Sequence, residues 1–243
     1  MLKEFVSVNR KICLMLEKVF PRFFGVPHNY NIDQLKMIDT IVKQYKELKV
    51  LEVGGADRPL LKKSDCYTYF GMDIDDKESC YQCYDEFLVQ SIEDKINDKF
   101  DLVISKTLLE HVPNNKRSMQ AMYDALNNGG SMLHYIPSKN HFYSICLRLV
   151  GPKLQKILIK YLRPEALDVS GYPAFFDKCS PNEMRRLCQV QGFKDIEIIC
   201  YYKATDYFTF FVPAFLVVST CENLFEFFGI SYFTAGFIIL AKK

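Results

Sequence analysis

Short apolar segments alternate with helical or turn segments through the middle of this chain. Strands that alternate with helices form a parallel sheet whose two faces are covered by helices, and this constrains the fold more than any other feature. We therefore predict a single open α/β sheet. The segments predicted as its strands are residues 50–53, 69–74, 86–89, 101–105 and 131–136.

Helices are predicted before and between these strands. Residues 1–24 form an amphipathic helix that ends at Pro21 and Pro27, and a second helix covers about 32–48. Residues 115–126 form a third helix, and the Asn and Gly residues at 127–130 suit its C-terminus. The apolar positions at helical spacing in the first helix are Phe5, Val8, Ile12, Met15, Leu16 and Val19.

The C-terminal part continues the same pattern. Ser180, Pro181 and Glu183 occupy the N-cap, first and third positions of a predicted helix that ends at Gly192. Two strands follow, in "FKDIEIICYY" and "SYFTAGFIILAKK".

Composition excludes several classes of protein. The net charge of +2 lacks the basic field of a general nucleic-acid binder. Nine cysteines, an odd number, favour a reduced, cytoplasmic protein. Cys80 and Cys83 form a CxxC without a second pair at zinc-site spacing, so we predict ordinary thiols and no metal site. Charged residues near the start argue against a signal peptide, and the apolar run 207–220 is too short to span a bilayer.

The stretch "VLEVGGADRPLL" at residues 50–61 is the predicted ligand loop. Ligands of open α/β sheets bind beyond the carboxyl ends of the strands, and this loop follows the first strand. Gly54 and Gly55 permit close backbone approach, while Asp57 and Pro59 suit the start of a helix. A glycine turn that binds nothing is the alternative.

The chemistry of the loop favours a cationic cofactor over a dinucleotide. A dinucleotide loop needs G-x-G-x-x-G so that pyrophosphate can contact bare backbone, whereas here Ala56 and Arg58 follow Gly54 at alternate positions. Glu52 would repel pyrophosphate and attract an ammonium or sulfonium group. Asp73, at the end of the second strand, is placed to accept hydrogen bonds from two ribose hydroxyls, unless it only caps the next turn.

Several motifs in order resemble one enzyme family. "VLEVGGADRP", "YFGMDID", "SIED", "FDLVISKTLLEHV" and "ALNNGGSMLHYIPS" are similar to class I S-adenosylmethionine-dependent methyltransferases, most of all the ubiquinone/menaquinone-biosynthesis type. The resemblance implies a Rossmann-like sheet of seven mostly parallel strands, flanked by helices, with the last strand antiparallel. It also implies an N-terminal helical cap (1–32), a cofactor-binding methyltransferase domain (33–243) and a lid or acceptor insertion (142–178).

The same resemblance implies contacts for S-adenosylmethionine and for its product S-adenosylhomocysteine. Asp73 would hold the ribose, Ile74 would pack against adenine, and Ile92 would give a backbone contact. Ser91 stands where the family usually has an acid that binds the adenine amine. The methionine part would be contacted by Glu52, Gly54, Gly55, Ala56, Ser105 and Lys106.

Methyl transfer to oxygen or nitrogen usually requires a base as well as in-line positioning. His111, His134, Tyr135 and His141 are near the predicted site. We select His111 and His141 as the catalytic candidates because His134 lies inside a strand, although a structural role remains open for each histidine.

The insertion and the aromatic C-terminal segments are predicted to face the acceptor. An amphipathic basic stretch such as 142–163 is typical of membrane-surface contact, or of a helix with a solvated basic face. The aromatic residues of 201–215 and 222–229 either line a pocket or fill the core. The basic residues of the insertion are Arg148, Lys153, Lys156, Lys160 and Arg163.

The predicted function is methyl transfer to a small molecule, such as a sugar, a lipid-linked intermediate or a quinone-like ring, in a cytoplasmic protein that contacts the membrane surface peripherally. Two alternatives remain at this point. One is methylation of protein or nucleic acid, against which the near-neutral charge and "SKTLLEH" after the fourth strand both count. The other is a catalytically silent binding module, which the departures at Ala56 and Ser91 suggest.

Overall fold

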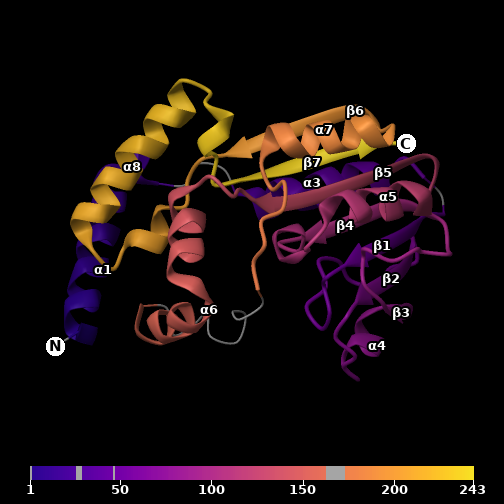
Figure 1. Ribbon diagram of the computed structural model, residues 1–243, viewed down its shortest axis with the longest axis horizontal. Helices are drawn as coiled ribbons and strands as arrows, with labels where there is room; N and C mark the ends of the chain where they lie inside the picture. Colours follow the sequence, from indigo (N-terminus) through magenta and orange to yellow (C-terminus); the bar gives the residue numbers. More distant parts are fainter. Residues whose placement is uncertain (1, 26–28, 46, 163–172) are drawn as a thin grey trace. The chain divides into compact units, whose positions relative to one another are not determined.

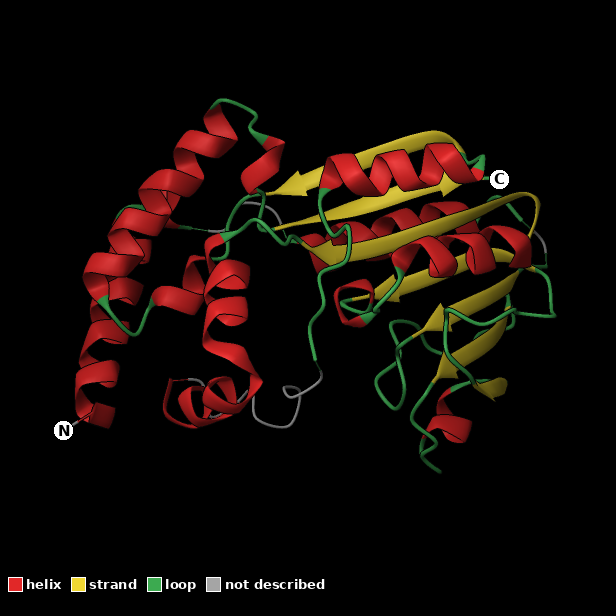
Figure 2. Ribbon diagram, in the orientation of Figure 1, coloured by secondary structure: helices red, strands yellow, loops and turns green. Residues whose placement is uncertain are grey.

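The computed structural model describes residues 2–25, 29–45, 47–162 and 173–243 (Figures 1 and 2). Its α-helices are α1 (Leu2–Val19), α2 (Pro21–Phe24), α3 (Tyr30–Val42), α4 (Cys80–Cys83), α5 (Asn115–Ala125), α6 (Phe142–Leu162), α7 (Pro181–Gln191) and α8 (Val212–Phe227). Its strands are β1 (Lys49–Val53), β2 (Thr68–Asp73), β3 (Glu86–Val89), β4 (Phe100–Lys106), β5 (Leu126–Pro137), β6 (Lys194–Tyr201) and β7 (Gly236–Lys242). Short 3-10 helices are η1 (Leu109–His111), η3 (Thr205–Phe208) and η4 (Ser231–Phe233).

The chain divides into two compact units. The helical unit comprises Met1–Asn29, Ser138–Ala174 and Cys200–Gly236, and the sheet unit comprises Tyr30–Pro137, Phe175–Ile199 and Phe237–Lys243. This division differs from the expected boundaries, because residues 200–236 group with the N-terminal helices and with the insertion. The assignment of a cap, a cofactor domain and a lid to these segments stays a prediction.

The seven strands form one sheet in the order β3-β2-β1-β4-β5-β7-β6. Strands β1 to β5 pair in parallel. The last strand runs antiparallel to β5, because the Lys243 N–H donates to the Gly130 carbonyl (2.9 Å) and the Ser138 N–H donates to the Ala235 carbonyl (2.9 Å). The predicted fold class is therefore confirmed, and the strand order reverses between β1 and β4, where such sheets bind ligands.

The central strands of the sheet unit are mainly apolar and are covered on both faces. Val50, Leu51 and Leu102 have no exposed surface. Helix α3 packs against β5, and α5 packs against α7 on the other face (Figure 1). A buried parallel sheet of this kind holds the ends of its strands at fixed positions, which is what a binding site at that edge requires.

Two predicted helix ends were wrong. The first helix ends at Val19, just before Pro21, and not at residue 24, because Pro21 begins the separate short helix α2, where proline suits the first turn. Residues 127–130 do not cap α5. They lie within β5, where the register shifts between Phe100 and Leu102, and the Asn127 amide donates to Asp101 Oδ1 (2.7 Å).

The helical unit has a small core of its own. Cys13 from α1, Phe24 from α2 and Phe215 from α8 are buried together, and the Phe24 and Phe215 rings stack with centroids 5.2 Å apart. The Asn9 side-chain oxygen accepts from the Val212 N–H at the start of α8 (2.9 Å). Among the described residues, no helix is both long and apolar enough to cross a membrane.

Candidate functional site

The loop after β1 has the backbone of a ligand loop. Gly54 has φ +79°, and its N–H donates to the Met72 carbonyl of β2 (2.8 Å). A Cβ at Gly54 would lie 2.7 Å from Leu108 Cδ1, so only glycine fits. Ala56 also takes a left-handed conformation, with φ +44°, which a small L-residue tolerates at some cost. The backbone of the loop therefore keeps a glycine-like form although alanine stands at position 56.

Glu52 lies behind this loop and holds it from within the sheet unit. Its carboxylate accepts hydrogen bonds from the Leu60 N–H (2.9 and 3.1 Å) and from the Tyr69 hydroxyl. A Cβ at Gly55 would lie 2.5 Å from Glu52 Oε1. Burial raises the pKa of Glu52 to about 7, against the hydrogen bonds that lower it. These contacts make Glu52 a support of residues 54–61, while its expected contact with the methionine part stays a prediction.

The end of β2 presents an acid and an apolar side chain in sequence. Asp73 is half-buried, and its Oδ1 accepts from the Asp75 N–H (3.0 Å). A carboxylate has capacity for further donors, so this bond leaves room for ribose hydroxyls. Burial raises the pKa of Asp73. Ile74 is 66% exposed, which is unusual for isoleucine. Its side chain could therefore pack against a flat apolar ring of a ligand.

The loop at the end of β3 contains Ser91, which stands where the family usually has an acidic residue. The Ser91 hydroxyl accepts from the Glu93 N–H (3.2 Å), and the Ser91 carbonyl accepts from the Asp94 N–H (3.1 Å). Ile92 is buried. This tight turn starts beside Asp73, because the Gln90 N–H donates to the Asp73 carbonyl (2.9 Å).

The end of β4 is held by buried polar side chains. The Ser105 hydroxyl lies 2.7 Å from His134 Nδ1, and the Ser105 carbonyl accepts from the Gln34 amide (2.8 Å). Burial lowers the pKa of His134 to about 3, so its ring is neutral and structural. After Lys106, Thr107 has φ +52°, which turns the chain sharply at the strand end. Sequence reasoning missed Gln34, for which no local pattern gave a signal.

Glu110 is the other residue that sequence reasoning missed. It is buried beside His111, whose Nε2 lies 3.7 Å from Glu110 Oε1. Within the described part of the chain, Glu110 Oε2 has no hydrogen-bond partner, and burial raises the Glu110 pKa to about 8. The Glu110 carbonyl accepts from the N–H groups of Phe175 (2.8 Å) and Phe176 (2.9 Å). An acid inside the apolar stretch "TLLEHV" was the available signal.

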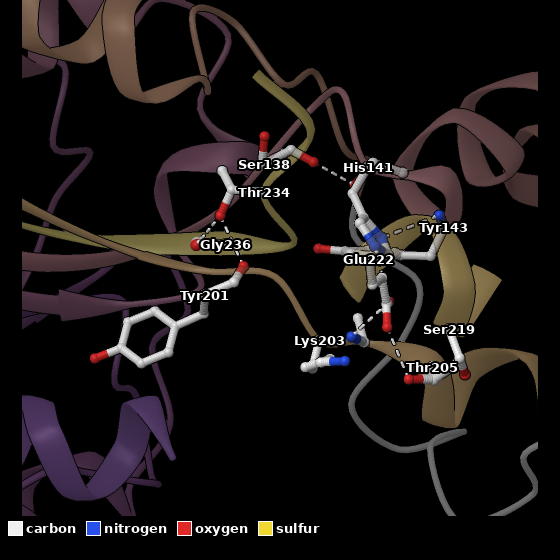
Figure 3. A network of polar contacts seen from close by, with 12 residues as sticks. Ser138, His141, Tyr143, Tyr201, Lys203, Thr205, Ser219, Glu222, Thr234 and Gly236 are labelled. Carbon is white, nitrogen blue, oxygen red and sulfur yellow. Dashed lines mark hydrogen bonds and ion pairs between the residues drawn. The ribbon is translucent and has the colours of Figure 1, made fainter. Parts of the chain in front are cut away.

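His141 lies in the helical unit, in a buried polar network (Figure 3). His141 Nδ1 accepts from the Tyr143 N–H (3.4 Å), and His141 Nε2 lies 3.1 Å from Glu222 Oε1. Glu222 also accepts from the Ala204 N–H (2.8 Å) and from the Thr205 hydroxyl (2.8 Å). Both ring nitrogens of His141 are engaged, and only 1% of the residue is exposed. This geometry gives the ring a structural use, and its role as a base stays an untested prediction.

The CxxC pair lies on α4, with Cys80 buried and Cys83 half-buried. The Cys83 thiol donates to the Ser79 carbonyl (3.4 Å). Across residues 2–25, 29–45, 47–162 and 173–243, His, Cys, Asp and Glu side chains form no group of three that could hold a metal ion.

The strand ends thus bring together Gly54, Asp73, Ser91, Lys106 and His111 in sequence order within one unit. The family pattern described as "Methyltransferase domain" matches residues 17–198. The chain belongs to this methyltransferase family. The match spans β1 to β5 and the predicted loop, so class I membership is confirmed, whereas the finer likeness to the ubiquinone/menaquinone type stays a prediction.

Solved structures share the fold of this chain at low identity. Phosphoethanolamine N-methyltransferase 2 of Haemonchus contortus, in complex with S-adenosyl-L-methionine, is 12% identical with TM-score 0.52, covering 100% of this chain and 60% of that one. A SAM-dependent methyltransferase of Archaeoglobus fulgidus is 15% identical with TM-score 0.50, covering 95% of this chain and 98% of that one. The CurJ carbon methyltransferase is 14% identical with TM-score 0.52, covering 87% of this chain and 53% of that one.

These likenesses establish the fold alone. The chain spans 60% of the length of the Haemonchus protein. A search of curated proteins gave no match to the chain.

Proposed function

We propose that this methyltransferase binds S-adenosylmethionine at the carboxyl ends of β1 to β4 and transfers its methyl group to a small molecule. The observation that carries the proposal is the pairing of the Gly54 loop with the tip of β2. The Gly54 N–H donates to Met72, and the next two residues are the half-buried Asp73 and the exposed Ile74.

The residues at this edge fit the cofactor part by part. Asp73 offers a carboxylate to the ribose hydroxyls, and Ile74 offers an apolar surface to adenine. Ser91 would meet the adenine amine with a hydroxyl in place of a carboxylate. The left-handed Ala56 keeps the turn open for the methionine part. No phosphate is present in this cofactor, so the loop does not need a third glycine.

S-adenosylmethionine supplies an electrophilic methyl group when it is bound, and the chain's own residues hold the acceptor and manage its proton. His111 follows Glu110 on η1, immediately after β4, and is partly exposed. Its imidazole ring is the base we assign to removing a proton from an oxygen or nitrogen acceptor. The Glu110 carboxyl lies 3.7 Å from His111 Nε2.

A small acceptor is favoured over a macromolecule. The net charge of +2 gives little attraction for nucleic acid. The Haemonchus enzyme has been solved in complex with phosphomonomethylethanolamine, a small polar molecule, and the CurJ protein is a carbon methyltransferase. Sugars, lipid-linked intermediates and quinone-like rings are the acceptor classes we propose for a cytoplasmic enzyme. The catalytically silent module remains the second candidate, because Ser91 lacks the acid that usually holds the adenine amine.

Calorimetry with S-adenosylmethionine and S-adenosylhomocysteine tests the proposal. We expect both to bind, and Asp73→Asn to weaken binding by at least about tenfold, since hydrogen bonds to a charged group contribute roughly 1.5–3 kcal/mol. Asp76→Asn is the matched control, because Asp76 lies on the loop that follows Asp73 and its carboxylate accepts from the Tyr81 hydroxyl of α4 (3.0 Å). Absence of binding by the wild-type protein would contradict the proposal. Binding without methyl transfer to any tested acceptor class would favour the silent module.

A further inference from the structure

One side of α1 exposes apolar residues at alternating spacings of three and four. A helix with this spacing carries its apolar residues in a single stripe. We call this set the α1 stripe: Phe5, Val8, Ile12, Met15 and Val19. All five are exposed, whereas the helix packs through a different side that contains Val6, Asn9 and Cys13. The sequence-predicted amphipathic helix therefore has two apolar sides, and only one of them is covered within the described residues.

Helix α8 extends the exposed apolar surface. It packs beside α1 in the same unit, and the Phe5 ring of the stripe stacks on Phe211, which immediately precedes α8, with centroids 6.4 Å apart (Figure 1). Leu216, Val217 and Leu224 are exposed along α8. At its end, Phe227 is 82% exposed and Phe228 is 66% exposed. A monomeric soluble protein rarely leaves so many large apolar side chains in water, so this surface indicates a partner.

The charges beside the stripe favour an anionic partner. Residues 1–24 contain five basic and two acidic side chains. Lys11 and Lys18 each follow a stripe residue by three positions, so they border the stripe along the helix. Further round α1, a hollow of about 350 Å³ is lined by Lys3, Arg10, Lys11 and, from α6, Lys160, together with Val6, Ser7 and Leu14.

The two acidic residues of α8 do not argue against an anionic partner. Glu222 is buried in the network with His141, and Glu226 lies 4.0 Å from Lys203 Nζ. Glu222 therefore presents no carboxylate to solvent, and the partly exposed Glu226 carboxylate is paired with Lys203.

We infer that the helical unit docks on an anionic lipid surface through the α1 stripe and the exposed residues of α8. An interfacial helix of this kind buries its apolar side in the acyl boundary while its lysines contact lipid phosphates. A second copy of the chain fits less well in an antiparallel contact, because two-fold symmetry then brings the Lys11 and Lys18 edges of the two helices toward each other. This surface differs from the predicted contact at 142–163, where Arg163 and the side chains of Lys153 and Lys156 lie outside the described residues.

Vesicle co-sedimentation with the full chain tests the inference. We expect binding to vesicles of phosphatidylglycerol and phosphatidylcholine in equal parts, and weaker binding to phosphatidylcholine alone. Phe227→Ser with Phe228→Ser should weaken binding by about tenfold or more per phenylalanine, since burial of each ring contributes at least about 1.5 kcal/mol. Val8→Ser with Met15→Ser should act in the same direction. Val190→Ser on α7 is the matched control, because Val190 is 73% exposed but lies in the sheet unit.

Two double charge-reversal variants separate the contribution of lipid charge to binding from the contribution of apolar contact. Lys11→Glu with Lys18→Glu should weaken binding to the anionic vesicles by at least about fivefold per lysine. Lys95→Glu with Lys116→Glu makes the same change of net charge in the sheet unit and should have little effect. Circular dichroism and S-adenosylmethionine calorimetry on each variant separate loss of docking from loss of folding or of the cofactor site.

Three results would overturn the inference. One is failure of the wild-type chain to pellet with anionic vesicles. Another is an equal loss of binding in the stripe variants and in Val190→Ser. The third is a dimer in sedimentation velocity that dissociates in Val8→Ser with Met15→Ser, because the stripe would then bind a second copy. None of these outcomes depends on methyltransferase activity.

Discussion

His141 Nε2 lies 3.1 Å from Glu222 Oε1, and both side chains are completely buried (Figure 3). Because His141 Nδ1 accepts from the Tyr143 N–H, Nε2 is the ring nitrogen that donates to Glu222 Oε1. The Glu222 carboxylate thereby links the start of α6 to α8, to the Ala204 N–H and to the Thr205 hydroxyl. A residue that sequence reasoning selected as a base is thus one end of a buried link between three segments.

Glu222→Ala should destabilise the protein strongly. Removing the carboxylate leaves the Ala204 N–H, the Thr205 hydroxyl and His141 without their acceptor, and breaking a buried pair in this way costs about 3–5 kcal/mol. Urea unfolding followed by circular dichroism measures the change. Glu226→Gln is the control, because its carboxylate is partly exposed and lies 4.0 Å from Lys203, and it should change the unfolding free energy by less than about 1 kcal/mol. Equal effects of the two variants would show that the network is not the stabilising feature.

His141→Phe separates a structural role from a catalytic one. A structural ring predicts a lower unfolding free energy, and at temperatures where the variant is folded it predicts methyl transfer with an unchanged pH profile. A base at His141 predicts the opposite pattern, in which stability is kept and the activity loses its rise with pH. Urea unfolding and a pH–rate profile with a reactive acceptor distinguish the two.

Stability should fall as pH rises toward 8 because of Glu110. Burial raises the pKa of this carboxyl from 4.5 to about 8. Between pH 4.5 and pH 8 the Glu110 carboxyl keeps its proton in the folded state, whereas the unfolded chain has released it. The free energy of unfolding therefore falls by about 1.4 kcal/mol for each unit by which the pH rises. Glu52 adds a similar slope, but only up to its pKa of about 7.

The window from pH 7 to pH 8 therefore isolates Glu110. Glu110→Gln cannot ionise, and the slope of its unfolding free energy across this window should be flatter than that of the wild type by about 1 kcal/mol per pH unit. Glu93→Gln is the control at a carboxyl on the turn after β3, and it should leave the slope unchanged. Parallel slopes for wild type and Glu110→Gln would contradict the raised pKa.

The positions of the strands along the chain and the loop after β1 could be predicted from sequence because they depend on local patterns. Apolar runs, a glycine pair and an acid at a strand end are all visible within a few residues. The partners of Glu52 and His141 could not be predicted in this way. Tyr69 is 17 residues from Glu52 and Glu222 is 81 residues from His141, and no periodicity indicates such pairs.

Dependence on distant partners also explains why the structure of residues 127–130 was predicted wrongly. Asn and Gly after a helix usually cap it, but here the backbone of Gly129 and Gly130 bonds to Lys243, which is distant in the sequence but adjacent in the sheet. Strand pairing with a distant segment determined the local structure. The exposed α1 stripe is a related case, because helical spacing shows that a helix has an apolar side but not which of two apolar sides packs.

Gly54→Ala should destabilise the sheet unit more than Gly129→Ala. Both glycines have positive φ, +79° and +83°, so both substitutions carry backbone strain. Only at Gly54 would the new Cβ also meet a neighbour, Leu108 at 2.7 Å, whereas nothing lies within 4 Å of a Cβ at Gly129. The difference in unfolding free energy, about 1–3 kcal/mol, isolates the steric contact. Leu108→Ala in the Gly54→Ala background should recover part of it, and no recovery would mean that backbone strain accounts for the effect.

Ser91→Asp should strengthen S-adenosylmethionine binding. The Ser91 hydroxyl already accepts from the Glu93 N–H, and an aspartate can keep that bond while it offers a charged acceptor to the adenine amine. A charge-assisted hydrogen bond in place of a neutral one gains about 1 kcal/mol, or roughly fivefold in affinity by calorimetry. Ser91→Ala, which removes the hydroxyl without adding charge, should not strengthen binding. An inosine analogue of the cofactor lacks the amine and should show no gain with Ser91→Asp. Equal gains for both cofactors would place the adenine amine away from β3.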